Sequence, residues 1–194
     1  MNRSQPPLAT RRLTLREFVP SDLEALQALA RDARVLEYAP GESRALDAVR
    51  RARATPAARR RPARRRAYEL AVVLNRSGKL IGACDLALSG ARSADIGYML
   101  APRHWGYGYG TEIARALVAF AFGPLALERL AAVVAIENDR SRRVLENAGL
   151  VWQGLMRRHL RVRGRTWDCH LYVIDRRRWL ALSAPCASVA GRGS

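Results

Sequence analysis

The chain has 194 residues, of which 49% are hydrophobic and 26% are charged, so it is long enough for one domain with a sizeable core and is neither fibrous nor wholly disordered in composition. The formal net charge is +17, and every basic residue except Lys79 is an arginine. This bias fits a coding preference as well as a surface for nucleic acid, an acidic protein or an anionic cofactor. Three widely spaced cysteines form no metal or disulfide pattern, and we find neither a secretory signal nor a membrane-spanning run. We therefore expect a cytoplasmic protein that has no metal and no contact with a membrane.

The N-terminal third predicts a strand followed by helices. Leu13–Phe18 alternates between apolar and polar residues, as a strand does. Ser21 and Glu24 have the spacing of a capping box, so a helix should open there. A second helix is expected over Glu42–Ala54. Thr55–Arg66 then carries six arginines and two prolines, which predicts a mobile basic loop, either merely solvated or in weak contact with RNA or an acidic surface.

The middle of the chain predicts a three-stranded meander. Tyr68–Leu74 and Lys79–Leu88 are apolar runs joined by the turn-forming sequence Asn75–Gly78. A second break leads to a third run, Ala94–Leu100. Strands that follow one another with such short breaks are expected to pair in antiparallel fashion.

Helices and strands alternate in the last third. We expect helices over Thr111–Phe122 and Ser141–Asn147. Leu130–Ile136 is a continuous apolar run, which is typical of a strand covered on both faces. Two further strands are expected over Gln153–Val162 and Trp167–Ile174.

These elements predict an α/β fold with a single mixed, mostly antiparallel sheet of about six to seven strands and helices on both faces. One domain should extend over residues 10–182. Residues 1–9 and 183–194 are expected to be flexible ends.

The most informative segment is Pro102–Glu112, where Gly106, Gly108 and Gly110 alternate directly after a strand and directly before a helix. Glycine allows positive φ and leaves space for a ligand, and the first N–H groups of a helix point out of its end. Such a turn is a phosphate cradle. A P-loop would need Lys and Ser or Thr after the last glycine, and a dinucleotide fold would not follow a meander.

The residues of this turn resemble a known family. Arg103-x-x-Gly106-x-Gly108 is similar to the acyl-CoA pyrophosphate motif of the GNAT N-acetyltransferases. The fuller patterns resemble the RimJ/RimL-type branch, which acetylates protein N-termini. They are Thr10-Arg11-Arg12-Leu13-Thr14-Leu15-Arg16 at the start, Ile96-Gly97-Tyr98 before the turn, Asn138-x-x-Ser141 with Gly149-Leu150 after it, and Trp167-Asp168 near the end.

The resemblance implies a GNAT-like sheet in which two parallel strands, here Ala94–Leu100 and Leu130–Ile136, splay apart around acetyl-CoA. An amine would then attack the thioester directly, with no covalent enzyme intermediate. Backbone amides around Leu100 would polarise the carbonyl. The residues expected to bind acetyl-CoA are Leu100, Arg103, His104, Gly106, Tyr107, Gly108, Tyr109, Gly110, Thr111 and Asn138.

The resemblance also suggests the groups that move protons. Asp95, on the splaying strand, is the first candidate for the general base, with Asp85 and Glu137 as alternatives. Many relatives carry a tyrosine seven residues after the asparagine, where this chain has Leu145. Ser141, one turn earlier, is therefore the candidate that protonates the departing CoA thiolate, unless it serves only at the helix N-terminus.

Three functions stay open at this point. The first is acetylation of a protein N-terminus, such as that of a ribosomal protein, and the second is acetylation of a small amine. The third is a non-catalytic module that binds acyl-CoA or RNA. The protein could act as a monomer or a homodimer.

Overall fold

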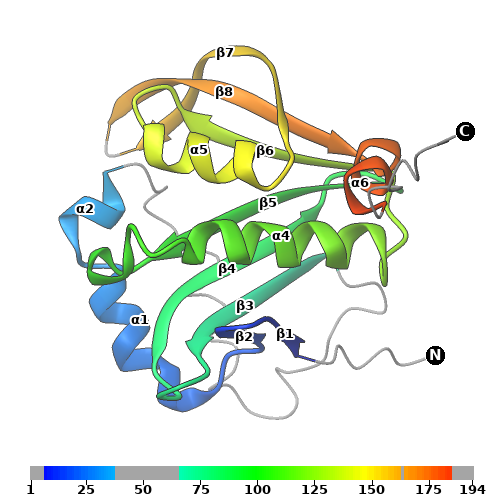
Figure 1. The fold of residues 1–194 in the computed structure, drawn as a ribbon. Coiled ribbons are helices and arrows are strands. Elements are labelled where there is room, and N and C mark those ends of the chain that lie inside the picture. Colours follow the sequence, from blue (N-terminus) through cyan, green and yellow to red (C-terminus); the bar gives the residue numbers. More distant parts are fainter. Residues whose placement is uncertain (1–6, 38–65, 163, 185–194) are drawn as a thin grey trace, which may run out of the picture.

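The computed structural model describes residues 7–37, 66–162 and 164–184. The expected second helix over 42–54 and residues 55–65 of the arginine-rich segment lie outside this part of the chain. The described residues form one eight-stranded sheet with the order β1-β2-β3-β4-β5-β6-β8-β7 (Figure 1). The strands are β1 (Leu8–Ala9), β2 (Leu13–Arg16), β3 (Ala67–Leu74), β4 (Leu80–Leu88), β5 (Ser93–Leu100), β6 (Arg129–Ala135), β7 (Val151–Val162) and β8 (Arg165–Asp175).

Helices cover both faces of the sheet, as expected. They are α1 (Leu23–Leu29), α2 (Ala33–Leu36), α4 (Tyr109–Phe122), α5 (Asp139–Asn147) and α6 (Arg176–Ser183), with single 3₁₀ turns at Pro20–Asp22 and Pro102–His104. Figure 1 shows α4 and α5 running over the same face of the sheet. No helix in the described ranges is long and apolar enough to cross a membrane.

Alternation along the strands creates two main cores on opposite faces of the sheet, apart from a small third cluster around Trp167 and Cys169. Leu70 and Val72 of β3 point into the large core beneath α4, which also contains Leu117. Ala71 of the same strand points the other way, into a smaller core that contains Leu26 of α1. Successive strand side chains face opposite sides, so β3 serves both cores with one apolar run.

The meander and the splayed pair are both confirmed. β3, β4 and β5 pair in antiparallel order. β5 and β6 are parallel, but their pairing covers only Ser93↔Arg129 to Asp95↔Ala131. β5 continues to Leu100 beside β4, and β6 continues to Ala135 beside β8. The two strands therefore separate after Asp95 and leave a gap between them.

Two expectations about local structure were wrong. Ser21 and Glu24 do not cap α1, whose N-cap is Asp22 without a side-chain cap hydrogen bond. The Asp22 carboxylate instead accepts two hydrogen bonds from Arg16, at 2.7 and 2.9 Å. β6 is not covered on both faces, because Val133 is 42% exposed.

The C-terminal end of the domain also contains a helix that was not predicted from the sequence, α6 (Arg176–Ser183). Trp179 packs against Phe122 of α4 with ring centroids 5.6 Å apart. A helix of eight residues is marginal by itself, so this contact with α4 helps to stabilise it.

Candidate active site

The gap between β5 and β6 is lined by backbone groups of β5. Ala101 N–H donates to the Ile81 carbonyl, so alternate residues of β5 from Ala101 backwards pair with β4. In an antiparallel ladder the intervening residues turn their N–H and C=O groups the other way. Those of Tyr98 and Leu100 therefore face the gap, beyond the last β5–β6 pair. Two N–H groups here are in position to polarise a carbonyl.

Trp105 holds the open end of this gap. Its indole Nε1–H donates to the Leu100 carbonyl at 2.8 Å. The ring packs against both cores, and the Arg140 guanidinium lies 4.9 Å from its centroid. This contact engages the carbonyl of Leu100, so the gap-facing group that Leu100 can offer a ligand is its N–H.

The N-terminus of α4 lies directly after this open end. Its N-cap, Gly108, has left-handed backbone angles and provides no side chain. Glu112 N–H makes the first helical bond, to the Gly108 carbonyl. The N–H groups of Tyr109, Gly110 and Thr111 precede that bond and point out of the helix end. With the helix dipole, these three donors form a site suited to a phosphate.

The three glycines of the turn have different roles. Gly106 and Gly108 have φ of +83° and +78°, a region that disfavours side chains. A Cβ on Gly106 would meet nothing within 4 Å, whereas one on Gly110 would lie 3.0 Å from Val144 and 3.3 Å from Tyr98. Gly110 therefore allows close packing of α4, and Gly106 and Gly108 shape the open side of the turn.

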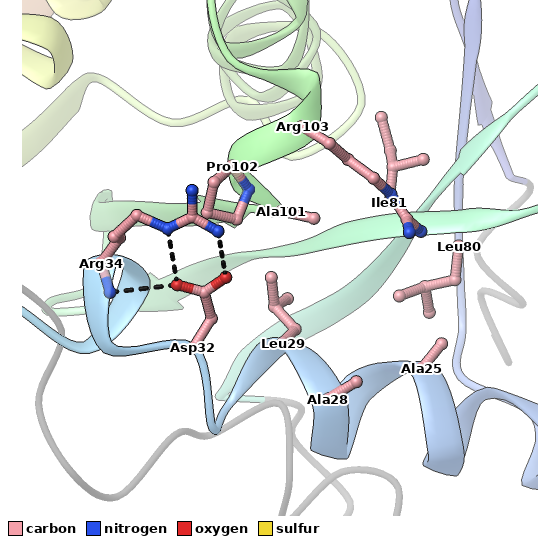
Figure 2. A pocket seen from close by; sticks show the side chains of 10 residues that line it. All are labelled: Ala25, Ala28, Leu29, Asp32, Arg34, Leu80, Ile81, Ala101, Pro102 and Arg103. Atoms are coloured by element: carbon pink, nitrogen blue, oxygen red, sulfur yellow. Dashed lines mark hydrogen bonds and ion pairs between the residues drawn. The ribbon is translucent and has the colours of Figure 1, made fainter.

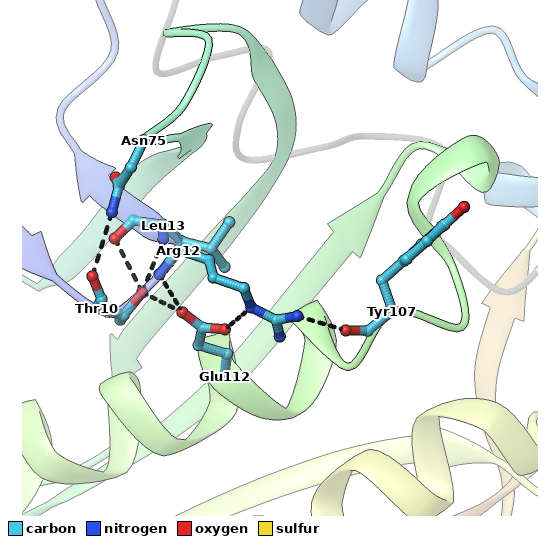
Figure 3. Close-up of polar contacts among 6 residues, drawn as sticks. All are labelled: Thr10, Arg12, Leu13, Asn75, Tyr107 and Glu112. Carbon is cyan, nitrogen blue, oxygen red and sulfur yellow. Dashed lines mark hydrogen bonds and ion pairs between the residues drawn. The ribbon is translucent and has the colours of Figure 1, made fainter.

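Arg12, in the turn between β1 and β2, holds the glycine turn in place (Figure 3). Its Nη1 donates to the Tyr107 carbonyl at 2.9 Å, and its Nε donates to Glu112 at 2.7 Å. The guanidinium also lies 4.5 Å from the centroid of the Tyr109 ring. Thr10 Oγ1 completes the contact by donating to Glu112 at 2.6 Å. We call Thr10, Arg12 and Glu112 the β2 clamp.

The β2 clamp keeps Glu112 ionised. Burial by itself would raise the pKa of Glu112, but hydrogen bonds from Thr10 and Arg12 and the charge of Arg12 hold it below the ordinary value. The carboxylate lies in the first turn of α4, where it could repel an anion. Its pairing with Arg12 neutralises that charge, so the helix end stays available to a phosphate.

The side chains of the other predicted cofactor residues differ in their exposure and in the direction they take from the turn. Tyr107 is 62% exposed, whereas Tyr109 is buried and its ring stacks on that of Tyr107 with centroids 6.0 Å apart. The Arg103 side chain leads away from the turn and donates to His104 Nε2 at 3.2 Å. Burial and the nearby charge of Arg103 lower the pKa of His104, which favours its neutral form.

α5 begins beside the same gap. Asn138 is its N-cap, and its Oδ1 accepts from Ser141 N–H at 3.1 Å. Ser141 Oγ accepts a hydrogen bond of 3.2 Å from the hydroxyl of Tyr98 on β5. Leu145 is buried in the core, as expected. Tyr98 was noted in the sequence only as part of a motif, so its contact with Ser141 is a feature that sequence reasoning missed.

The candidate bases lie elsewhere. Asp95 is exposed at the closed end of the β5–β6 gap, on the α1 face of the sheet. Asp85 lies on the same face opposite Gly97, where a Cβ would come within 2.9 Å of its carboxylate. Glu137 is exposed in the turn between β6 and α5. Two of the three carboxylates therefore share the face of the sheet opposite α4.

A pocket of about 260 Å³ opens on that same face, at the end of β5 (Figure 2). Residues of α1, the start of β4 and the Ala101–Arg103 segment line it. Asp32 and Arg34 form an ion pair of 2.8 Å at its edge, and Figure 2 shows Arg103 directed along its other side. The pocket and the glycine turn thus adjoin the same end of β5 from opposite faces.

In the described ranges no group of three or more His, Cys, Asp or Glu side chains could hold a metal ion.

The model of the acetyltransferase (GNAT) domain family matches residues 12–151, which include the splayed strands, the glycine turn and α5. The chain belongs to the GNAT acetyltransferase family. The family assignment made from the two motifs is therefore confirmed.

Two curated relatives come from Bacillus subtilis. The uncharacterized N-acetyltransferase YoaA is 35% identical over 43% of this chain and 47% of its own length. YdaF, whose name assigns it provisionally to ribosomal N-acetyltransferases, is 38% identical over 45% of this chain and 48% of its own. The matched region thus spans about half the length of each of these relatives.

Solved structures share the fold. A GNAT acetyltransferase from Bacillus anthracis superposes with a TM-score of 0.73 and 23% identity, over 89% of this chain and 99% of that one. Spermidine N-acetyltransferase from Vibrio cholerae, in complex with CoA and spermine, has a TM-score of 0.72 and 22% identity, over 88% and 99%. At these identities the likeness concerns the GNAT fold.

Proposed function

We propose that this protein transfers an acetyl group from acetyl-CoA directly to a primary amine. The observation that carries the proposal is the gap between β5 and β6, which ends at three unpaired helix N–H groups of α4. A long, anionic thioester substrate fits this arrangement, because the N–H groups can hold its pyrophosphate while its acyl end enters the gap.

The residues of the chain divide the chemistry among them. Gap-facing N–H groups of Tyr98 and Leu100 polarise the thioester carbonyl. Ser141, at the start of α5, gives a proton to the sulfur as the thioester breaks. Asn138, whose Oδ1 caps α5, can offer its amide N–H₂ group to the same substrate.

A carboxylate on the α1 face takes the proton of the acceptor ammonium in this proposal. Asp95 is our first candidate, and Asp85 is the alternative that lies two residues, about 7 Å, nearer the open end along β5. Replacing the base by Asn should lower kcat/KM by about a hundredfold at neutral pH. Comparing Asp95→Asn with Asp85→Asn assigns the role, and a full rate in both would exclude this row of acids.

For the acceptor, we propose the α-amine of a protein, and the RimJ/RimL-like motifs support this choice. The pocket on the α1 face also favours an acceptor with few further positive charges. Two arginines, Arg34 and Arg103, lie among its described lining residues, and the carboxylate of Asp32 is engaged by Arg34. A polyamine, which carries several cations, would be repelled there.

A small amine is the second candidate acceptor. The favouring observation is the row of carboxylates on the α1 face, together with the fold shared with the spermidine N-acetyltransferase of Vibrio cholerae. Such acids could attract a cationic amine to the end of β5.

The deciding experiment is acetyl-CoA turnover with matched acceptors, read by mass spectrometry. One peptide has a free α-amine, a second has a blocked α-amine and a free lysine, and spermidine represents small amines. We expect acetylation of the first peptide alone. Modification of spermidine alone would favour the second candidate, and bound but unconsumed acetyl-CoA with every amine would contradict catalysis.

A further inference from the structure

The side chain of Tyr98 lies between the N-terminal parts of α4 and α5. A Cβ placed on Gly110 of α4 would come within 3.3 Å of the Tyr98 ring and within 3.0 Å of Val144 of α5. The phenol therefore packs where both helices begin, and its backbone belongs to the part of β5 that faces the gap. Packing alone would be satisfied by a phenylalanine, so the hydroxyl needs its own explanation.

The hydroxyl of Tyr98 connects β5 to the proposed proton donor. It donates to Ser141 Oγ at 3.2 Å, while Ser141 N–H is engaged by Asn138. A serine hydroxyl that accepts one hydrogen bond still has its own proton to donate. The direction of the Tyr98 bond thus leaves the Ser141 proton for a third group at the gap.

We propose that Tyr98 is a positioning residue that orients the Ser141 hydroxyl and replaces the proton that Ser141 gives to the departing CoA sulfur. This inference rests on the proposed function. As the carbon–sulfur bond breaks, its electron pair stays on sulfur, the Ser141 proton moves to sulfur, and the Tyr98 proton moves to Ser141 Oγ. The phenolate then regains a proton from water, so the enzyme returns to its starting state.

Two further features fit this role. Burial raises the pKa of Tyr98, and the hydrogen bond with Ser141 only partly opposes the rise. The phenol is therefore protonated at neutral pH, and a phenolate formed in the relay would readily regain its proton. α5 itself offers no phenol at position 145, where Leu145 is 3% exposed and belongs to the core. The strand therefore supplies a phenol at the start of a helix that lacks one.

The test uses bound CoA, whose thiol reports on hydrogen-bond donors without any acceptor amine. Donors aimed at the sulfur stabilise the thiolate, which is detected by its ultraviolet absorbance at about pH 8, near the ordinary pKa of a thiol. We expect the thiolate-to-thiol ratio to fall about tenfold in Ser141→Ala and several-fold in Tyr98→Phe. In the double variant the loss should match that of Ser141→Ala, because Tyr98 acts through Ser141.

Tyr172→Phe is the matched control. Tyr172 of β8 is buried, and its hydroxyl donates to Glu146 of α5 at 2.8 Å. Its removal should leave the thiolate ratio unchanged. Turnover should follow the same pattern, with a lower kcat but an unchanged KM for acetyl-CoA in Tyr98→Phe.

The outcomes separate this inference from the function beneath it. If calorimetry detects no CoA binding by the parent protein, the proposed function fails and the relay fails with it. If CoA binds and the Tyr98→Phe ratio equals that of the parent, the relay alone is overturned. The relay would also be overturned if the decrease in the thiolate-to-thiol ratio in the double variant equalled the product of the two single decreases, because residues that act independently have multiplicative effects.

Discussion

Two helices begin beside the gap between β5 and β6, and their N-termini are built in opposite ways. α4 starts at Gly108, which offers no side-chain cap. α5 starts at Asn138, whose side chain accepts from Ser141 N–H. The first therefore leaves its backbone donors for a ligand, whereas the second satisfies a donor internally and presents a hydroxyl.

This difference gives the two helices different roles in the proposed site. Backbone N–H groups do not ionise and suit a permanently charged phosphate, so they hold a substrate without taking part in its chemistry. A hydroxyl can move a proton, and Ser141 is held by Asn138 from one side and Tyr98 from the other. Binding should thus depend on α4 and turnover on α5.

The largest expected effect is on turnover at α5. Ser141→Ala should lower kcat by about ten- to a thousandfold, in the range of one proton-transfer group or somewhat less. The affinity for acetyl-CoA should change little, because α4 is untouched. Steady-state kinetics with calorimetry checks this, and a parental kcat would mean that the thiolate takes its proton from water.

A smaller effect is expected on binding at α4. Gly108→Ala should weaken acetyl-CoA binding about tenfold, or ~1.4 kcal/mol, because a side chain at φ +78° displaces the turn. Calorimetry on the purified variants measures this change.

Gly78→Ala is the control for backbone strain. Gly78 has φ +65° in the β3–β4 turn, and a Cβ there would meet nothing within 4 Å. Both variants should lose about 1 to 2 kcal/mol of stability, but only Gly108→Ala should lose affinity. Equal affinities in the two variants would remove the glycine turn from the binding site.

Arg12 offers a third test, which extends the comparison from α4 to the clamp behind it. Arg12→Gln releases the Tyr107 carbonyl and leaves Glu112 as an unneutralised charge at the helix end. We expect KM for acetyl-CoA to rise several-fold with kcat nearly unchanged. Arg92→Gln, which removes an exposed ion pair with Glu128, should change neither value. A fall in kcat alone would place the effect of Arg12 at α5.

The sequence predicted the α4 side of this comparison well and the α5 side in part. The glycine turn and the helix after it are determined by residues close together in the sequence, so their pattern could be recognised from the sequence. The same holds for the β3–β5 meander. Asn138 and Ser141 were singled out by their resemblance to a family motif, and their roles stay predictions; their contacts with each other and with Tyr98 were not foreseen.

Contacts between distant residues account for what the sequence did not predict. Tyr98 and Ser141 are 43 positions apart, and Arg12 and Glu112 are 100 apart. Each contact forms because the strand order of the sheet brings the two residues together. The contact cannot be predicted from one sequence when the strand order is unknown. α6 was missed for a related reason, because a helix of only eight residues depends on packing, here of Trp179 on Phe122.

The smallest expected effect is the dependence of the β2 clamp on acid. The pKa of Glu112 is lower in the folded protein than its ordinary value, so its contribution to stability is fully present above that ordinary value, about 4.3. It should be lost as the pH falls through the lower folded value. The free energy of unfolding of Glu112→Gln should therefore fall less steeply than that of the parent as the pH drops from about 5 to 3. Unfolding followed by tryptophan fluorescence measures this slope. A parental slope in Glu112→Gln would mean that the carboxylate is not stabilised by its clamp.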